Sequence, residues 1–222
     1  MAFVKIPGKG LLSRIFRNCA DPKGALGRLM LRMMNFGHRP VYAWTFDHCP
    51  FADGMRALDV GCGGGGAIVE LSRRFSTIRV DGIDASAESV AMCRRRVAAR
   101  VANPGEIVQG VADALPMADS AYDVAYAIET VYFWPDLCAG LREMKRVLKC
   151  GGVAAVSVEC FDPARAGVWK DLVGHMEVRT LEQIAQAFRD AGFANVSIFK
   201  KGENRPTWCG VASVIGRKPI GN

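Results

Sequence analysis

The chain has 222 residues, of which half are hydrophobic, and its formal net charge is +7. A chain of this length suits one α/β domain with a short extension, because cores of this size fold as a unit. No apolar run reaches the eighteen residues of a spanning helix, so we expect no membrane span.

The N-terminal segment carries the whole net charge. Its first 46 residues contain eight lysines and arginines against Asp21 alone. Arginines alternate with leucine, isoleucine, phenylalanine and methionine, which predicts helices with one apolar and one basic face. We expect residues 1–50 to form a basic helical arm or lid and residues 51–222 to form the main domain.

Three roles are open for this arm. It packs on the main domain with its basic face in solvent, or it adds positive potential for an anionic substrate or lipid surface, or it is a processed targeting peptide. A secretory signal is excluded, since charges interrupt every apolar stretch of the segment.

A strand, a glycine turn and a helix follow in residues 56–75, which begin RALDVGCGGGG. Ala57, Leu58 and Val60 suit a buried strand, and helical periodicity resumes at residue 67. The turn satisfies GxGxxG, which is typical of sites for dinucleotides or other adenosine-bearing ligands. The segment therefore predicts a nucleotide-type cofactor site.

Asp59 distinguishes between these ligands, because it stands two residues before the first glycine of the turn. A carboxylate there would repel a pyrophosphate. S-Adenosylmethionine has no phosphate and carries an ammonium and a sulfonium, so an acidic entrance favours it over NAD.

The rest of the chain alternates strands with helices, which predicts a parallel sheet covered on both faces. Strands are expected at residues 77–84, 106–110, 122–128, 153–159, 193–200 and 208–216, and helices at residues 67–75, 88–101, 136–149 and 181–191. The loop before the last strand is too short for a parallel crossover, so the last two strands should pair antiparallel.

With these motifs, the chain resembles the class I S-adenosylmethionine-dependent methyltransferases over residues 55–216. Their first motif, (D/E)xGxGxG, is met by Asp59, Gly61, Gly63 and Gly65, and GIDAS, ADALP and REMKRVLKCGG are further shared stretches. The broad group that includes quinone-biosynthesis enzymes is the most similar, although Cys150 stands where proline is usual. The resemblance implies a Rossmann-like, seven-stranded, mostly parallel sheet with an antiparallel last strand and an N-terminal helical extension.

Acidic residues at the predicted strand ends are the main candidates for cofactor binding. Asp84, 21 residues after Gly63, can accept hydrogen bonds from both ribose hydroxyls. The resemblance implies that Asp113 accepts a hydrogen bond from the adenine amino group. The predicted cofactor-binding set is Asp59, Gly61, Cys62, Gly63, Asp84, Ala85, Ala112, Asp113, Ala114 and Glu129.

Catalytic candidates are fewer, because methyl transfer mainly requires alignment of the acceptor and removal of at most one proton. We select Glu129, Tyr132 and His38, with His48 and His175 as further possible bases. Tyr132 and Trp134 are candidates for the substrate pocket, whereas Phe133 is expected to pack as core. His38, Tyr42 and Trp44 are candidate lid residues.

Cysteine and histidine spacing gives no metal signature, so we expect no metal site. None of the eight cysteines forms a CxxC pair, which predicts reduced thiols and a cytoplasmic location. The alternative is that four cysteines come together in space and bind a thiophilic substrate: Cys138, Cys150, Cys160 and Cys209.

The expected function is methyl transfer from S-adenosylmethionine to a small-molecule acceptor, with S-adenosylhomocysteine as product. Residues 51–222 carry almost no net charge, so we expect no nucleic-acid partner and at most peripheral membrane contact through the arm. Two alternatives remain: a non-catalytic protein that binds an adenosine cofactor, a partner or a membrane, and an NAD-dependent oxidoreductase. Neither the oligomeric state nor the acceptor is predicted.

Overall fold

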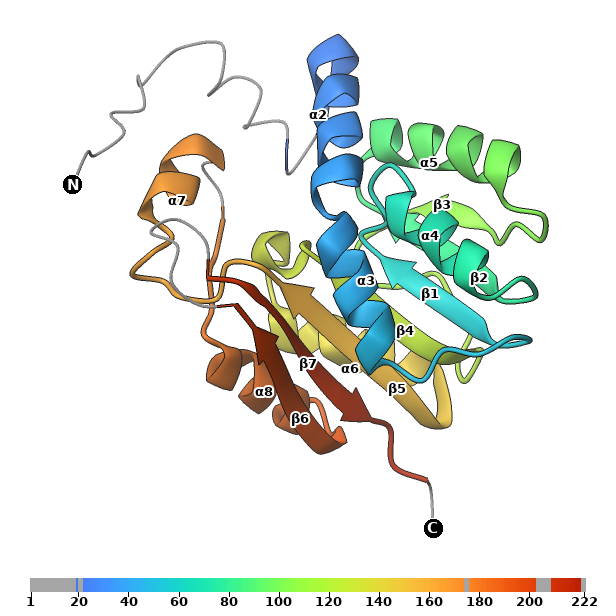
Figure 1. The fold of residues 1–222 in the computed structure, drawn as a ribbon. Helices are drawn as coiled ribbons and strands as arrows, with labels where there is room; N and C mark the ends of the chain where they lie inside the picture. Colours follow the sequence, from blue (N-terminus) through green and yellow to red (C-terminus); the bar gives the residue numbers. More distant parts are fainter. Residues whose placement is uncertain (1–18, 20–21, 174–175, 203–208, 221–222) are drawn as a thin grey trace.

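A seven-stranded sheet forms the centre of the computed structural model, which describes residue 19 and residues 22–173, 176–202 and 209–220 (Figure 1). The strand order is β3-β2-β1-β4-β5-β7-β6, and β7 runs antiparallel to both neighbours. The strands are β1 (Arg56–Val60), β2 (Arg79–Asp84), β3 (Ile107–Gln109), β4 (Tyr122–Ile128), β5 (Leu148–Val158), β6 (Ala194–Lys201) and β7 (Val211–Arg217). The predicted seven-stranded, mostly parallel sheet with an antiparallel last strand is confirmed, and that last strand lies between β5 and β6.

Helices cover both faces of this sheet, as Figure 1 shows. They are α2 (Gly24–Gly37), α3 (Arg39–His48), α4 (Gly66–Arg74), α5 (Ala87–Arg100), α6 (Leu137–Val147), α7 (Gly167–Val173) and α8 (Leu181–Asp190), with a 3-10 turn η1 (Val131–Phe133). One core lies under α3, α4 and α5 and the other under α6 and α8. Ala57 belongs to the first and Leu58 to the second, as expected for a strand buried on both faces.

Side-chain caps fix several helix starts. Ser86 accepts a hydrogen bond from the backbone N–H of Ser89 and caps the start of α5. Thr180 and Gln183 form a reciprocal capping box at the start of α8. The short elements η1 and α7 were not predicted, because three to seven residues give too little periodicity to detect.

The N-terminal helices pack on the domain. Met30 and Leu31 of α2 are buried, and Arg28 forms a 3.2 Å ion pair with Glu88 of α5. Packing on the domain is the first of the three roles considered for the arm. Residues 1–18 lie outside the described part of the chain, so the boundary at residue 50 stays a prediction. Among the described helices, none is long and apolar enough to cross a membrane.

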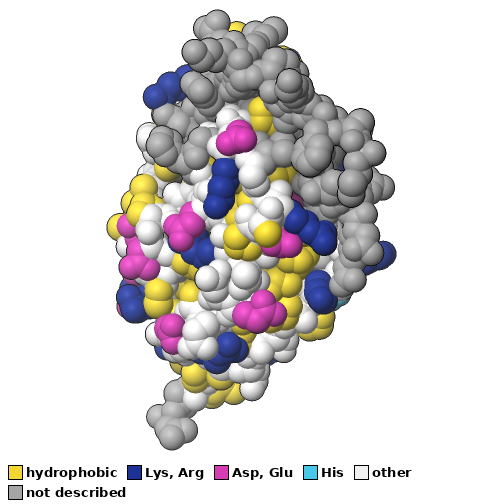
Figure 2. Space-filling model, turned by 90° about the vertical axis from the view of Figure 1, so that its left-hand side faces the viewer, with side chains coloured by type: hydrophobic (Ala, Val, Ile, Leu, Met, Phe, Trp, Pro, Cys, Tyr) yellow, Lys and Arg dark blue, Asp and Glu magenta, His cyan; other side chains and the backbone are white. Residues whose placement is uncertain are grey.

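Charges of both signs are interspersed on the face shown in Figure 2, where lysines and arginines lie among acidic and hydrophobic side chains. A nucleic-acid groove needs clustered positive charge along one surface. This face offers no such cluster among the residues described.

A chain of three buried hydroxyls fixes α3 to the sheet. Thr45 Oγ1 lies 2.7 Å from Ser157 Oγ, which lies 2.6 Å from Ser213 Oγ. Ser157 is on β5 and Ser213 on β7, so the chain joins a helix of the arm to two strands. All three residues are fully buried.

We predict that Ser157→Ala lowers the free energy of unfolding by about 1–3 kcal/mol, because it leaves two buried hydroxyls without their shared partner. Urea denaturation would measure this loss. Ser197→Ala, at an exposed position of β6, is the matched control and should change stability by less than about 0.5 kcal/mol. Equal stability of the two variants would contradict the proposed docking of α3.

Candidate active site

The carboxyl ends of the parallel strands enclose a cavity of about 340 Å³. We call it the strand-end cavity. Its lining includes Gly61 and Gly63 after β1, Asp84 at the end of β2, Ala112 after β3 and Glu129 after β4. Ligands of open α/β sheets bind at this edge, near the reversal of strand order between β1 and β4.

The glycine turn after β1 allows close packing at this edge. Gly61 has a φ of +85°, and a Cβ there would collide with the Thr130 side chain. Asp84 holds the turn in place, because its Oδ2 accepts from the backbone N of Gly63 at 2.8 Å and its Oδ1 accepts from the backbone N of Ser86 at 2.9 Å. Asp84 thus supports the turn and also lines the cavity.

Asp59 lies below the turn as a buried acid with an unmet hydrogen-bonding need. Its exposed fraction is 2 %, and Oδ2 has no hydrogen-bond partner among the described residues. Burial, together with the charge of Asp84, raises its pKa well above the ordinary value. The neighbouring Tyr126 hydroxyl acts in the opposite direction and lowers the pKa, although it does not complete a hydrogen bond to the carboxylate.

Asp81 provides a contrast, because it is equally buried and fully paired. It accepts hydrogen bonds from Arg56 at 2.7 Å, from the Tyr122 hydroxyl at 2.8 Å and from the backbone N of Glu106 at 2.8 Å. A satisfied buried carboxylate has a structural explanation in its partners. Asp59 has no such explanation within the described chain.

A small cavity of about 40 Å³ separates Asp59 from the arm. We call it the turn cavity. Asn35 and His38 from the α2 region and Tyr42 from α3 line it opposite the glycine turn. Asn35 is 8 % exposed, and its Nδ2 has no hydrogen-bond partner among the residues described. The turn cavity therefore contains one unpaired acceptor and one unpaired donor.

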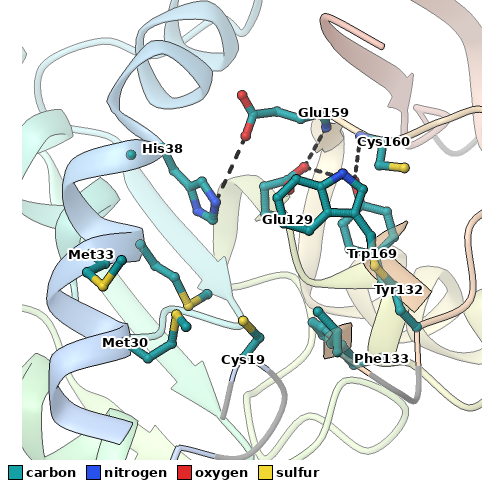
Figure 3. A pocket seen from close by; sticks show the side chains of 14 residues that line it. Cys19, Met30, Met33, His38, Glu129, Tyr132, Phe133, Glu159, Cys160 and Trp169 are labelled. Atoms are coloured by element: carbon teal, nitrogen blue, oxygen red, sulfur yellow. Dashed lines mark hydrogen bonds and ion pairs between the residues drawn. The ribbon is translucent and has the colours of Figure 1, made fainter. Parts of the chain in front are cut away.

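A third cavity, of about 240 Å³, adjoins the strand-end cavity. We call it the methionine cavity, because Met30, Met33, Met34 and Met176 line it. Figure 3 shows the α2 methionines on one side, Phe133 and Trp169 on the other, and the polar groups of His38, Glu129 and Glu159 together at one end. The two cavities share Cys19, Met34, Glu129 and Phe133. These four residues therefore mark the junction between the two cavities.

Glu129 occupies this junction in an uncommon conformation. Its φ is +58°, a left-handed value that non-glycine residues rarely adopt and that occurs often at functional sites. Its Oε1 accepts hydrogen bonds from the Tyr132 hydroxyl at 2.9 Å and from the backbone N of Glu159 at 2.5 Å. Burial, with the nearby charge of Glu159, raises the pKa of Glu129 to about 8.

His38 faces Glu159 across the same end of the methionine cavity, with 3.9 Å between Nε2 and the carboxylate Oε2. Burial lowers the pKa of His38 to about 4, so the imidazole is neutral at physiological pH. Potential ligand atoms of His38, Glu129 and Glu159 all lie within 4.8 Å of one another. The residue types could hold a cation, a possibility that the sequence did not indicate.

The structure brings most of the predicted site residues together. Glu129, Tyr132 and His38 line the methionine cavity, whereas Asp84, Ala85, Ala112, Asp113 and the turn glycines line the strand-end cavity. Cys62 lines the turn cavity instead. Ala114 closes a turn through a 3.4 Å hydrogen bond from its backbone N to Val111 O and lies beside the cavity rather than in its lining.

Other candidates lie elsewhere. His48 packs against Trp44 and Phe199, away from all three cavities, so neither His48 nor Trp44 is positioned for the chemistry. His175 lies outside the described residues. The expectation that Phe133 only packs as core is wrong, since its half-buried ring lines both large cavities because η1 turns it toward their junction.

The cysteines are free thiols. Cys160 lines the methionine cavity and is adjacent to Cys209, but the Cys138 thiol contacts the carbonyl of Ala187 and Cys150 is exposed. The four cysteines therefore do not form one thiophilic cluster.

Two residues of the site were missed. Glu159 directly follows β5, as Glu129 follows the neighbouring β4, so the adjacent ends of two parallel strands could have indicated it. Asn35 gives no signal in the sequence, because its place above the glycine turn depends on how α2 packs.

Known proteins share both the sequence pattern and the fold. A family model described as a methyltransferase domain matches residues 58–156. A fatty-acid O-methyltransferase from Mycolicibacterium smegmatis is 37 % identical over 100 residues, which cover 45 % of this chain and 35 % of that protein. The 27-O-demethylrifamycin SV methyltransferase of Amycolatopsis mediterranei is 30 % identical over 169 residues, or 72 % and 61 % of the two chains. The chain thus spans less than two thirds of the length of these relatives.

Among solved structures, the methyltransferase-fold chain crystallised with the Haloferax volcanii Trm112 methyltransferase activator superposes with a TM-score of 0.77 at 22 % identity, covering 92 % of this chain and 97 % of that one. That likeness concerns the fold alone. The matched domain and the methyltransferase relatives, together with the glycine-turn motif, identify residues 58–156 as a methyltransferase domain of the class I S-adenosylmethionine-dependent type.

Proposed function

We propose that the chain transfers a methyl group from S-adenosylmethionine to a small-molecule acceptor. The observation that carries this proposal is the buried Asp59 Oδ2 beside the glycine turn, which has no hydrogen-bond partner among the described residues. A buried acceptor without a partner fits a ligand that brings its own ammonium group.

The residues of the strand-end cavity suit the adenosine part of this donor. Asp84 lines this cavity, and a carboxylate at that place can accept hydrogen bonds from ribose hydroxyls. Ala112 and Asp113 line the wall after β3, where an adenine ring would find backbone groups and a carboxylate. The roles of these residues remain part of the proposal.

When bound, S-adenosylmethionine supplies an activated methyl group on a sulfonium. The chain's own task is then to align an acceptor, exclude water and remove a proton where the acceptor carries one. The methionine cavity is the proposed binding site of the acceptor, because it adjoins the strand-end cavity at Glu129, Met34 and Phe133. Its mainly apolar wall would exclude water from the reacting atoms.

Glu129 is the proposed proton acceptor. A base is most effective when its pKa lies near the working pH, and burial raises the pKa of Glu129 to about 8. Tyr132 holds the carboxylate through its hydroxyl and in turn accepts from the backbone N of Cys160 at 3.0 Å, so Tyr132 is a positioning residue. His38 is neutral and borders the same end of the cavity.

The curated relatives support a small-molecule acceptor, since their names specify a fatty acid, a rifamycin precursor and a phytyl hydroquinone. Membership of the quinone-methyltransferase group stays a prediction. The comparisons give no support to an NAD-dependent oxidoreductase or to a non-catalytic binder.

Label transfer tests the proposed activity. Incubation of the chain with methyl-labelled S-adenosylmethionine and a cell extract should move label into small-molecule products. Asp59→Asn should raise the KM for the donor at least about tenfold, because a hydrogen bond to a charged group contributes ~1.5–3 kcal/mol. Asp190→Asn, at the exposed end of α8, is the control and should leave the KM unchanged. Tight donor binding with no labelled product would favour the non-catalytic alternative.

The raised pKa of Glu129 also predicts a pH dependence of stability. Between its unfolded value of 4.5 and its folded value of about 8, the native state holds a proton that the unfolded state has lost, so stability falls as pH rises. His38, lowered from 6.5 to about 4, acts in the opposite direction below pH 6.5. The window from pH 6.5 to 8 therefore isolates Glu129 from His38.

We expect Glu129→Gln to gain stability relative to the unmodified protein across this window, by at most about 1.4 kcal/mol per pH unit. Thermal or urea denaturation at several pH values would measure the gain. Glu182→Gln, on the exposed face of α8, should follow the unmodified protein in parallel. If Glu129→Gln also runs parallel, Glu129 does not hold the extra proton.

A further inference from the structure

Asn35 lies at the N-terminal end of α4, outside the segment that matches the methyltransferase domain. A Cβ added at Gly64 would collide with Asn35 Nδ2, and a Cβ at Gly66 would collide with Asn35 Oδ1. The Asn35 amide thus rests directly on the backbone of the glycine turn. Glycine at these two positions leaves the space that this side chain fills.

The start of α4 has no side-chain cap. Gly65 is its N-cap residue, and the first turn of α4 carries no acidic residue. The first backbone N–H groups of a helix lack intrahelical acceptors, and the helix dipole makes this end attractive to an anion. An anionic group in the turn cavity would accept hydrogen bonds from this end of α4.

Asn35 gives independent support for an anion at the same place. Its Nδ2 is a buried donor with no partner among the described residues, and the side chain lines the turn cavity together with Gly63 and Gly64. An unused donor of this kind costs free energy unless a ligand accepts from it. The cavity of about 40 Å³ has room for a group the size of a carboxylate.

Asp59 lines the turn cavity as well, and its carboxylate favours a cationic ligand group there. A cation beside Asp59 and an anion between Asn35 and α4 describe a site for a zwitterionic α-amino acid group.

We propose that Asn35 binds the carboxylate of the donor's amino acid end, so that α2 forms part of the cofactor site and selects donors that carry this carboxylate. This inference rests on the proposed function. It assigns to α2 a binding role in addition to its packing on the domain, and it couples placement of the arm to occupancy of the cofactor site.

The test combines a change in the ligand with a change in the protein. Calorimetry would compare S-adenosylmethionine with decarboxylated S-adenosylmethionine, which keeps the adenosine, sulfonium and amine and lacks only the carboxylate. The unmodified protein should prefer the complete ligand by at least about tenfold. Asn35→Ala should reduce this preference about five- to tenfold, chiefly by weakening the complete ligand.

Two further variants complete the experiment. Asn35→Asp should reduce the preference more than Asn35→Ala does, because it places a negative charge against the carboxylate. Asn103→Ala, at an exposed position after α5, should leave the preference unchanged.

Equal weakening of both ligands by Asn35→Ala would overturn the inference, since it would show that Asn35 only supports the shape of the turn. An unchanged preference in Asn35→Ala would overturn it too. Both of these results leave the proposed function standing, because the complete ligand still binds. Failure of the unmodified protein to bind S-adenosylmethionine would contradict the proposed function itself, and this inference with it.

Discussion

Burying a carboxylate without a partner costs several kcal/mol, and a folded protein rarely retains such a cost where a neutral residue would pack equally well. Asp59 is such a carboxylate at the end of β1. Asp81, at the same depth in the neighbouring strand, has three hydrogen-bond partners. Asp81 is fully paired within the protein whereas Asp59 is not, and we propose that a ligand completes the hydrogen bonding of Asp59.

The carboxyl ends of the parallel strands position the other acidic residues of the site. Because β4 and β5 are parallel neighbours, the residues that directly follow them, Glu129 and Glu159, meet at one end of the methionine cavity. The raised pKa of Glu129 is a consequence of this meeting and of burial. The arm closes the opposite side through α2, which contributes methionines to one cavity and Asn35 to another. The family domain alone therefore does not complete the site.

Much of the fold could be predicted from the sequence, because it depends on local patterns. The alternation of strands with helices predicts the parallel sheet, the short final loop predicts its antiparallel last pair, and β4 was predicted with its observed bounds. The strand-ending acids Asp84 and Glu129 could be selected by the same reasoning. The start of β5 was placed too late, because Gly151 and Gly152 suggest a break whereas the strand continues through them after a shift in register.

The rest of the site depends on tertiary packing, which local patterns do not encode. Asn35 becomes informative only when α2 lies over the turn, and Phe133 reaches both cavities only because η1 redirects the chain after β4. The separation of His48 from the site likewise follows from the way α3 packs, with its last turn directed toward β6. No local sequence pattern indicates where these side chains lie.

Proton release on ligand binding tests the central claim most directly. If Asp59 binds the ammonium group of S-adenosylmethionine, its raised pKa should fall when this ligand binds, and the protein should release a proton. Calorimetry in buffers of different ionisation enthalpy, repeated over a range of pH, measures this release. The account predicts a pH range in which the unmodified protein releases more protons than Asp59→Asn does. Identical proton release from the two proteins at every pH would contradict it.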